Sequence, residues 1–244
     1  MTIALITGAS RGLGRELAEE LAGRGWSLVL DARHPDMLAE AERAIRPRLA
    51  PDASLVAIAG DVADDAHRRA LVVAADHLGG LDLVVNNAST LGATPLPHLA
   101  AYPIAELTHV LEVNIIAPLA LIQEALVVLR RSARPAVLNI TSDASVEPYE
   151  GWGGYGLSKA ALDHMSAILA VEEPSLLVWA VDPGDMRTQM HQDAFPGEDI
   201  SDRPLPAEVV ADLAALVEAG LPSGRYRRSD LAPVTLPSVE SEAS

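Results

Sequence analysis

Tyr155 and Lys159 stand four residues apart and are the side chains in this chain most suited to chemistry. Positions four apart in a helix lie on one face, so the phenol and the ammonium would be neighbours. An ammonium beside a phenol favours the phenolate and lowers the pKa of the phenol toward neutral pH. The pair is then a proton donor and acceptor suited to making or breaking an alcohol. The spacing alone is weak evidence, because two solvated side chains on a helix also produce it.

A glycine-rich turn near the start of the chain gives this pair a context. The run 7–14 follows a strand-like apolar segment and opens a helix-like one. Such a turn cradles the pyrophosphate of a dinucleotide at the helix N-terminus. Gly8 permits a tight turn, Gly12 lets the backbone approach phosphate, and Gly14 allows close helix packing. The turn and the Tyr–Lys pair together predict hydride transfer.

Composition limits the class of protein. Hydrophobic residues make up 49% and charged residues 21% of the 244 residues, enough for a sizeable core. The absence of cysteine excludes disulfides, thiolate metal sites and thiol nucleophiles, and His191 has no second ligand at metal-binding spacing. No apolar run reaches the length of a membrane span, and the strand-like first residues show no signal peptide. We therefore expect a cytoplasmic protein with no metal and no membrane partner.

The formal net charge is −16. A surface this acidic repels phosphates and no basic stripe offsets it, so we expect no nucleic-acid partner. An anionic cofactor must then be captured by a local positive site, because the overall field opposes it.

Short apolar runs alternate with helical patterns, which predicts an α/β fold with a doubly wound parallel sheet in three layers. Pro118 should kink or loosen the longest helix. The segment 184–204 follows the last strand, where ligands sit in such sheets, and is expected to be an irregular lid. The tail 232–244 has no periodicity and is expected to be disordered. Strands are expected over 2–7, 27–31, 54–60, 81–86, 136–141 and 175–181, and helices over 13–24, 36–48, 64–78, 102–131, 153–171 and 206–219.

With these motifs in this order, the chain resembles the short-chain dehydrogenase/reductase family in its single-domain form. The glycine turn has the family's GxxxGxG spacing, and Asn-Asn-Ala-Ser at 86–89 is similar to its Asn-Asn-Ala-Gly motif. Pro-Gly with Thr five residues after the Pro, at 183–188, resembles its segment near the nicotinamide. The resemblance covers nearly the whole chain and implies one NAD(P)-binding Rossmann-like domain over 1–231.

The resemblance implies four catalytic residues. Tyr155 would be the general acid for carbonyl reduction or the base for alcohol oxidation. Lys159 would lower its pKa and bind the nicotinamide ribose. Ser142 would hold the substrate oxygen against Tyr155, and Asn114 would position a water that links Lys159 to solvent.

The resemblance also implies the cofactor contacts. They come from the glycine turn, from the ends of the strands, where Asp61 and Val62 would meet adenine, and from the lid. The expected set is Gly8, Ser10, Arg11, Gly12, Leu13, Gly14, Arg33, Asp61, Val62, Asn87, Ala88, Tyr155, Lys159, Pro183, Gly184 and Thr188.

The sequence favours NADP(H) over NAD(H). An acid at the end of the second strand binds the ribose hydroxyls of NAD, whereas a basic side chain there accepts the 2′-phosphate of NADP. By the family's spacing the deciding position is Ala32, which is not acidic. Arg33 follows it and Arg11 lies in the glycine turn, so two arginines can clamp the phosphate. Strand alternation points Asp31 to the other face, but a slip of one residue would make it an acid that selects NAD.

Two departures from the family bear on partners. Asp143 follows Ser142 where a second small residue is more usual, and it either disfavours anionic substrates or points at backbone. The segment 222–228 lacks the family's VDGG ending, which commonly helps to build a tetramer. We therefore expect a homodimer formed by the long helices that hold Asn114 and Tyr155, and a tetramer remains an alternative.

The expected substrate is a small-molecule carbonyl or alcohol that the sequence does not specify. Tyr149 and Trp152 either line the substrate mouth or pack on the surface, while Met186, Met190, His191 and Phe195 belong to the lid. Three other functions compete with this interpretation: a non-catalytic NAD(P)-binding regulatory protein, an NAD-dependent alcohol dehydrogenase, and a sugar-nucleotide epimerase or dehydratase. The complete set of catalytic residues argues against the first, and the lack of room for a large C-terminal substrate domain argues against the last.

Overall fold

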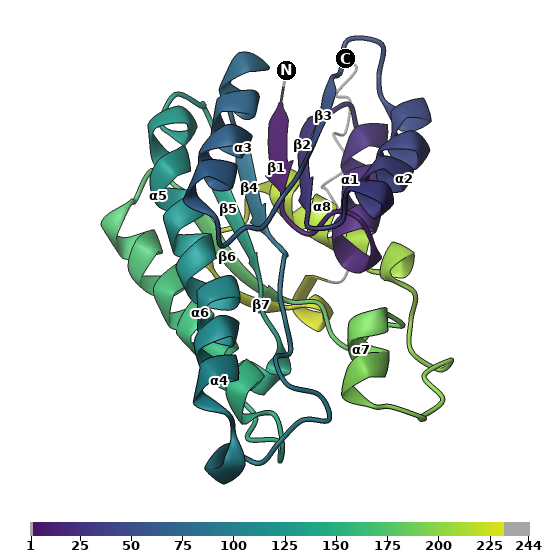
Figure 1. Cartoon of the computed structure of the whole chain (residues 1–244). Coiled ribbons are helices and arrows are strands. Elements are labelled where there is room, and N and C mark those ends of the chain that lie inside the picture. Colours follow the sequence, from purple (N-terminus) through teal and green to yellow (C-terminus); the bar gives the residue numbers. More distant parts are fainter. Residues whose placement is uncertain (1, 232–244) are drawn as a thin grey trace, which may run out of the picture.

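The computed structural model describes residues 2–231 and is built around one parallel sheet. Its seven strands lie in the order β3-β2-β1-β4-β5-β6-β7 (Figure 1). The order reverses between β1 and β4, so the sheet is doubly wound, as the sequence predicts. The strands are β1 (Ile3–Ile6), β2 (Ser27–Ala32), β3 (Leu55–Ala59), β4 (Leu83–Asn86), β5 (Ala136–Ile140), β6 (Leu177–Asp182) and β7 (Gly224–Arg227).

Helices cover both faces of the sheet and complete the three layers (Figure 1). One face carries α1 (Gly12–Gly23), α2 (Pro35–Ile45) and α8 (Val210–Ala219). The other carries α3 (Asp65–His77), α5 (Ala117–Leu129) and α6 (Gly153–Glu172). Two further helices, α4 (Ile104–Leu111) and α7 (Gln189–Ala194), lie toward the carboxyl ends of the strands. Ligands bind at this end in open α/β sheets.

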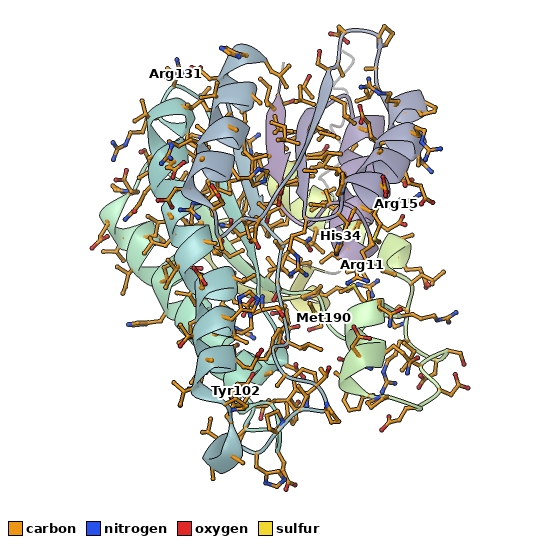
Figure 2. The ribbon with its side chains drawn as sticks, in the orientation of Figure 1. Arg11, Arg15, His34, Tyr102, Arg131 and Met190 are labelled. Carbon is orange, nitrogen blue, oxygen red and sulfur yellow. The ribbon has the colours of Figure 1, made fainter. Side chains whose placement is uncertain are left out.

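The end of the sheet that faces α7 carries several of the expected site residues. Figure 2 shows Arg11 and His34 close together above Met190 of α7, whereas Arg131 lies at the opposite end of the molecule. Arg11 lies in the turn between β1 and α1, and His34 comes two residues after the end of β2. The two residues meet because a parallel sheet brings the carboxyl ends of its strands to one edge.

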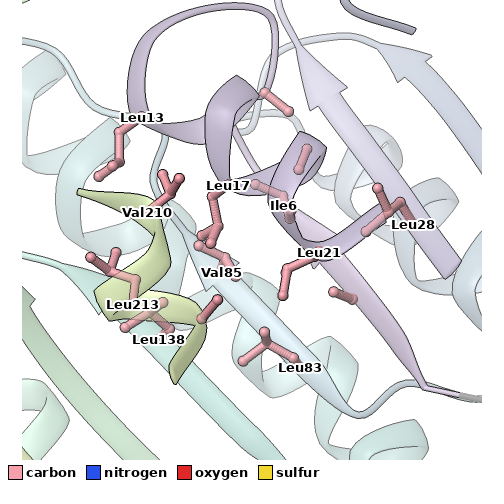
Figure 3. Close-up of a cluster of buried hydrophobic side chains, with 14 of the residues drawn as sticks. Ile6, Leu13, Leu17, Leu21, Leu28, Leu83, Val85, Leu138, Val210 and Leu213 are labelled. Carbon is pink, nitrogen blue, oxygen red and sulfur yellow. The ribbon is translucent and has the colours of Figure 1, made fainter. Parts of the chain in front are cut away.

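Two apolar clusters, one on each face, hold the layers together. Strands buried on both faces read as continuous apolar runs, and β1 and β2 are buried along their whole length. On α1, Leu13, Leu17 and Leu21 recur at helical spacing and belong to the same core cluster as Ile6 of β1 and Val210 of α8 (Figure 3). This packing fixes α1, and with it the glycine turn that opens α1, against the central strands.

The expected long helix is interrupted where Pro118 predicts it. A π-helical turn, Glu112–Ile116, joins α4 to α5 and carries Asn114. Pro118 has no amide hydrogen to offer the Asn114 carbonyl, which it would meet in an α-helix, and the chain widens just before it. Sequence alone indicates the loosening and its place.

The stretch Ile104–Leu129 is 26 residues long and apolar enough, by length and composition, to cross a membrane. The expectation that no apolar segment has this length is therefore wrong. In the fold, Leu121, Ile122 and Leu129 pack in the core cluster under α3 and α6. The apolar side chains of this stretch thus form part of the core between the helices and the sheet.

Two elements differ from expectation at the end of the chain. The sequence indicates no strand at 224–227, yet β7 pairs with β6 there. The segment 184–204, expected to be irregular, contains α7, where the Thr188 side chain accepts from the His191 amide. The tail prediction for 232–244 lies outside the described residues.

Candidate active site

A cleft of about 490 Å³ opens at the carboxyl ends of the strands. It runs from the glycine turn past Tyr155 to the lid, and of the expected site residues only Gly14 and Asn114 do not line it. Chain segments that are far apart in sequence therefore meet in one place.

Tyr155 and Lys159 lie together in the first turns of α6. Both are buried, and the Lys159 ammonium is 5.4 Å from the centre of the Tyr155 ring. Lys159 Nζ donates to the carbonyl of Ile140, the last residue of β5, at 2.7 Å. This bond ties the helix to the sheet beneath the cleft.

The expected lowering of the Tyr155 pKa is wrong. Burial raises the pKa of the phenol well above its usual value, and the carboxylates of Asp182 and Asp143 add to the rise, against a hydrogen bond with Ser142. Burial also lowers the pKa of Lys159 to about 8, against the pull of Asp163. Desolvation is thus the largest cause of the pKa shift of each group.

Ser142 follows β5 and starts a short 3₁₀ turn, Asp143–Ser145. Its hydroxyl accepts from the Ala144 amide at 3.2 Å and donates to Asp143 Oδ1 at 3.0 Å. It is also a hydrogen-bonding neighbour of the Tyr155 phenol. Ser142 is thus both a cap residue and a neighbour of the phenol.

Asn114 is buried in the π turn and fastens three segments together. Its amide nitrogen donates to the Thr90 carbonyl and to Ser158 Oγ, each at 2.9 Å. Its oxygen accepts from the Thr90 amide at 2.9 Å and from Ser89 Oγ at 3.1 Å. Within residues 2–231 its side chain therefore bonds to the neighbour of Lys159 and not to Lys159 itself.

The glycine turn has the form of an anion cradle. Gly8 and Gly12 adopt positive φ angles of 67° and 57°, which favour glycine. A Cβ on Gly14 would lie 2.3 Å from Asn87 Nδ2 and 2.5 Å from the Gly8 carbonyl oxygen. Arg11 is the N-cap residue of α1, and its side chain does not bond to the first amides of the helix. The first turn of α1 contains no acidic residue. An uncapped helix N-terminus with close backbone access fits a pyrophosphate group.

Asn87 and Thr7 hold this turn against the end of β4. Asn87 Nδ2 donates to the carbonyls of Thr7 and Gly8 at 2.9 and 3.1 Å. The Thr7 hydroxyl accepts from the amides of Asn87 and Ala88, each at 3.1 Å. The motif after β4 therefore positions the cradle.

Strand alternation points Asp31 toward α3, opposite to Ala32, as the sequence predicts. The buried Asp31 carboxylate meets His67 Nε2 at 2.6 Å and accepts from the Gly8 amide at 3.4 Å. Burial raises the pKa of Asp31, against its bonds with His67. The Asp31 carboxylate thus already forms hydrogen bonds within the protein, to the His67 ring and the Gly8 amide.

Arg11 and Arg33 are exposed at the same end of the cleft. Across the part of the chain that the structure describes, neither forms an ion pair. They supply the local positive charge that an acidic protein needs to capture an anion.

The remaining expected contacts lie around the rim. Val62 is buried beside Val113 and Ala117, and Asp61 Oδ1 accepts from the Ala63 amide at 2.9 Å. Gly184 has φ 75° and donates its amide to Asp182 Oδ1 at 3.0 Å. Other expected residues lining the cleft are Ser10, Leu13, Ala88, Pro183 and Thr188.

Aromatic and sulfur-containing side chains close the other end of the cleft. Trp152 stands edge-on to the Tyr155 ring with centroids 5.7 Å apart, and Phe195 packs on Trp152 at 5.8 Å. Met186, Met190 and His191 also line the cleft. Trp152 therefore faces the cleft, whereas Tyr149 lies at its margin and donates to Asp143 Oδ2 at 2.9 Å.

Sequence reasoning missed Arg225 of β7. Its guanidinium contacts Asp163 at 2.8 Å and donates to the Ser142 carbonyl and to Ser145 Oγ at 3.1 and 3.2 Å. It also missed His67, which contacts Asp31, and Ser158, which accepts from Asn114 and donates to the Tyr155 carbonyl at 2.7 Å. No sequence pattern marks these residues, because each acts across a long chain separation.

Comparison with known proteins shows what this chain is similar to. The profile of the short chain dehydrogenase family matches residues 2–199. Mouse sepiapterin reductase is 34% identical over 200 residues, which cover 78% of this chain and 76% of the relative. A short chain dehydrogenase from Salmonella enterica superposes with a TM-score of 0.85 at 28% identity, covering 93% of this chain and 95% of that one. An alcohol dehydrogenase from Thermococcus sibiricus complexed with 5-hydroxy-NADP gives 0.82 at 26%, covering 93% and 95%.

Proposed function

The chain belongs to the short chain dehydrogenase family of oxidoreductases, and from that premise we propose that it interconverts a carbonyl and a secondary alcohol with NADP(H). The observation that carries this proposal is the common cleft: Tyr155, Lys159 and Ser142 share it with the glycine turn and two arginines. Acid–base groups and a dinucleotide cradle thus face the same space.

The chain's own groups fit the cofactor along the cleft. The glycine turn would hold the pyrophosphate on the amides of α1, and Arg11 with Arg33 would hold the 2′-phosphate. Val62 would lie against the adenine, while Lys159, Pro183, Gly184 and Thr188 would lie near the nicotinamide ribose. When bound, the nicotinamide supplies or accepts the hydride.

The protein's part in the reaction is to hold the carbonyl oxygen and to move one proton. Tyr155 donates its phenolic proton to the oxygen during reduction and takes it back during oxidation. Ser142 orients that oxygen against the phenol, and Lys159 stabilises negative charge as it forms on Tyr155. Asn114 acts through Ser158 to keep α6 in register with the turn after β4.

We propose reduction as the working direction, because NADPH pools usually drive reductions. Burial keeps the Tyr155 phenol in its protonated form, which is the form that donates to a carbonyl oxygen, although its raised pKa makes it a weaker acid than a free phenol.

Cofactor preference is tested by titrating the protein with NADPH and NADH while following nicotinamide fluorescence. We expect NADPH to bind at least about tenfold more tightly, which corresponds to roughly 1.4 kcal/mol. Arg33→Ala should remove most of this difference. Arg15→Ala is the matched control, because Arg15 pairs with Glu19 and does not line the cleft. A preference of the wild type for NADH would overturn the NADP assignment.

Catalysis by Tyr155 is tested with Tyr155→Phe, which removes only the hydroxyl. We expect turnover of any accepted carbonyl to fall by about 10³-fold or more while the dissociation constant of NADPH stays nearly unchanged. Turnover that survives the change would mean that another group supplies the proton. Loss of NADPH binding would mean that the phenyl ring itself is misplaced, and the comparison would then rest on Ser142→Ala.

A further inference from the structure

The carboxylate of Asp143 stands directly beside the hydroxyl that must hold the substrate oxygen. Asp143 Oδ1 accepts from Ser142 Oγ at 3.0 Å and from the Ala144 amide at 2.8 Å. Oδ2 accepts from the Tyr149 hydroxyl at 2.9 Å. A carboxylate offers about four acceptor positions, so three hydrogen bonds fix its orientation and leave about one position free.

Asp143, Ser142, Tyr155 and Trp152 all line the same cleft. The charge of Asp143 is close enough to raise the pKa of the Tyr155 phenol. A substrate whose carbonyl oxygen reaches Tyr155 and Ser142 must therefore place its neighbouring atoms beside this carboxylate.

The Ser142 hydroxyl has one proton, and in the structure that proton points to Asp143. A carbonyl oxygen only accepts hydrogen bonds, so it can use Ser142 only after the hydroxyl turns away from Asp143. Turning away removes one hydrogen bond to a charged acceptor, which is costly at a partly buried position. A simple ketone brings nothing to replace that bond.

A donor on the carbon next to the carbonyl would replace it. Such a donor lies roughly 3 Å from the carbonyl oxygen, by ordinary C=O and C–C bond lengths. That separation matches the 3.0 Å between Ser142 Oγ and Asp143 Oδ1. The substrate donor can then bond to Asp143 while the Ser142 hydroxyl bonds to the carbonyl oxygen.

We propose that Asp143 determines specificity, by selecting carbonyl compounds that carry an O–H or N–H donor on the adjacent carbon and rejecting those that carry a carboxylate there. The inference rests on the proposed carbonyl reduction and names the substrate class of that site. Each hydrogen bond that is broken on binding is replaced by one to the substrate, so the selection comes from matching donors to acceptors.

Four aryl ketones test the proposal because they differ only in the group next to the carbonyl. They are 2-hydroxyacetophenone, its methyl ether 2-methoxyacetophenone, acetophenone and phenylglyoxylate. With NADPH, the wild type should show a kcat/KM for the hydroxy ketone at least about tenfold above that for the methyl ether, as expected for one hydrogen bond to a carboxylate. Phenylglyoxylate should be the poorest of the four.

Asp143→Asn should bring the hydroxy and methoxy ketones close to the same kcat/KM and should improve phenylglyoxylate, because the amide presents a donor where the carboxylate presents an acceptor. Glu147→Gln is the matched control. It removes one carboxylate from the same loop, but Glu147 is exposed and does not line the cleft. The control should keep the wild-type order of the four ketones. Asp143→Ser gives a second comparison should the asparagine variant fail to fold.

A binding measurement separates specificity from rate. Calorimetry should show 1-phenyl-1,2-ethanediol binding to wild-type protein with NADP⁺ at least about tenfold more tightly than its 2-methoxy analogue, and about equally to Asp143→Asn. The role of Asp143 would be overturned, with the proposed function intact, if the wild type reduced the hydroxy and methoxy ketones equally well. It would also be overturned if Asp143→Asn kept the wild-type preference for the hydroxy ketone. Failure of the wild type to reduce any of the four would overturn the substrate class, and equal NADPH consumption by Tyr155→Phe would overturn the proposed function itself.

Discussion

Burial, more than pairing, sets the protonation of the Tyr155–Lys159 pair. Both side chains are almost completely buried, and the Lys159 ammonium bonds to a backbone carbonyl and not to the phenol oxygen. Desolvation therefore keeps the phenol neutral and makes the ammonium easier to deprotonate. The spacing of the two residues could be read from the sequence, but the direction of the Tyr155 shift could not, because it depends on depth in the fold.

The lowered pKa of Lys159 predicts a dependence of stability on pH. In the unfolded chain Lys159 titrates near 10.5, and in the folded protein near 8. Between these values the unfolded state binds more protons, so the stability of the wild type rises with pH through this window. Below pH 8 the cost of the buried ammonium is fully present.

Urea unfolding of the cofactor-free wild type and of Lys159→Met measures this effect, because all other groups are common to both. From pH 7 to pH 10 the free energy of unfolding of the wild type should rise relative to the variant by roughly 1–3 kcal/mol. A difference that stays constant over this range would show that Lys159 titrates alike in the folded and unfolded states.

At the scale of elements, β7 is the part of the site that the sequence did not reveal. Its sequence, Gly-Arg-Tyr-Arg, has no apolar alternation, and it forms a strand because the edge of β6 offers a partner. Once paired, β7 directs Arg225 under the turn that carries Ser142. By contrast, the π turn could be anticipated, because Pro118 marks its place in the sequence.

Arg225 is a positioning residue that acts through Ser142. Arg225→Met removes the bonds to the Ser142 carbonyl, Ser145 and Asp163, so kcat for an accepted ketone should fall by about tenfold or more. The dissociation constant of NADPH should change little, because Arg225 does not line the cleft. Stability should fall by roughly 1–3 kcal/mol, so rates are measured well below the unfolding transition.

Two further variants separate positioning from general stability. Arg225→Lys keeps the charge and should recover part of kcat. Arg227 lies on the same strand, but it is exposed and its ion pair with Glu147 is long, at 3.9 Å. Arg227→Met should therefore leave kcat unchanged. Equal losses of kcat in Arg225→Met and Arg227→Met would contradict the role of Arg225.

For the whole molecule, the order of elements could be predicted because each apolar strand is followed by an amphipathic helix. That alternation leaves few topologies for a parallel sheet. The cleft follows from the topology, since the motif residues stand where strands end. Contacts such as Asp31 with His67 could not be predicted, because they depend on how α3 packs across the end of β2.

Exposed apolar side chains gather on the helices that flank the site on one side. On the π turn and α5, Ile116 and Val127 are 57% and 71% exposed, and on α6, Leu157 and Ile168 are 49% and 44% exposed. Each pair is eleven residues apart, a spacing that puts both members on one helix face. The two helices belong to the same layer (Figure 1). We propose that these faces form the interface of a homodimer, since a monomer rarely leaves such a surface uncovered.

Light scattering coupled to size-exclusion chromatography tests this proposal. The wild type should have twice the mass of one chain, and the double variant Val127→Glu with Ile168→Glu should have the mass of one, because two buried carboxylates without partners would oppose association. Val73→Glu is the control, since Val73 is 51% exposed on α3, outside these faces. A wild-type mass of four chains would indicate a second interface, and the double variant should then be a dimer. A wild-type monomer, or a double variant that keeps the wild-type mass, would show that these helices do not join the subunits.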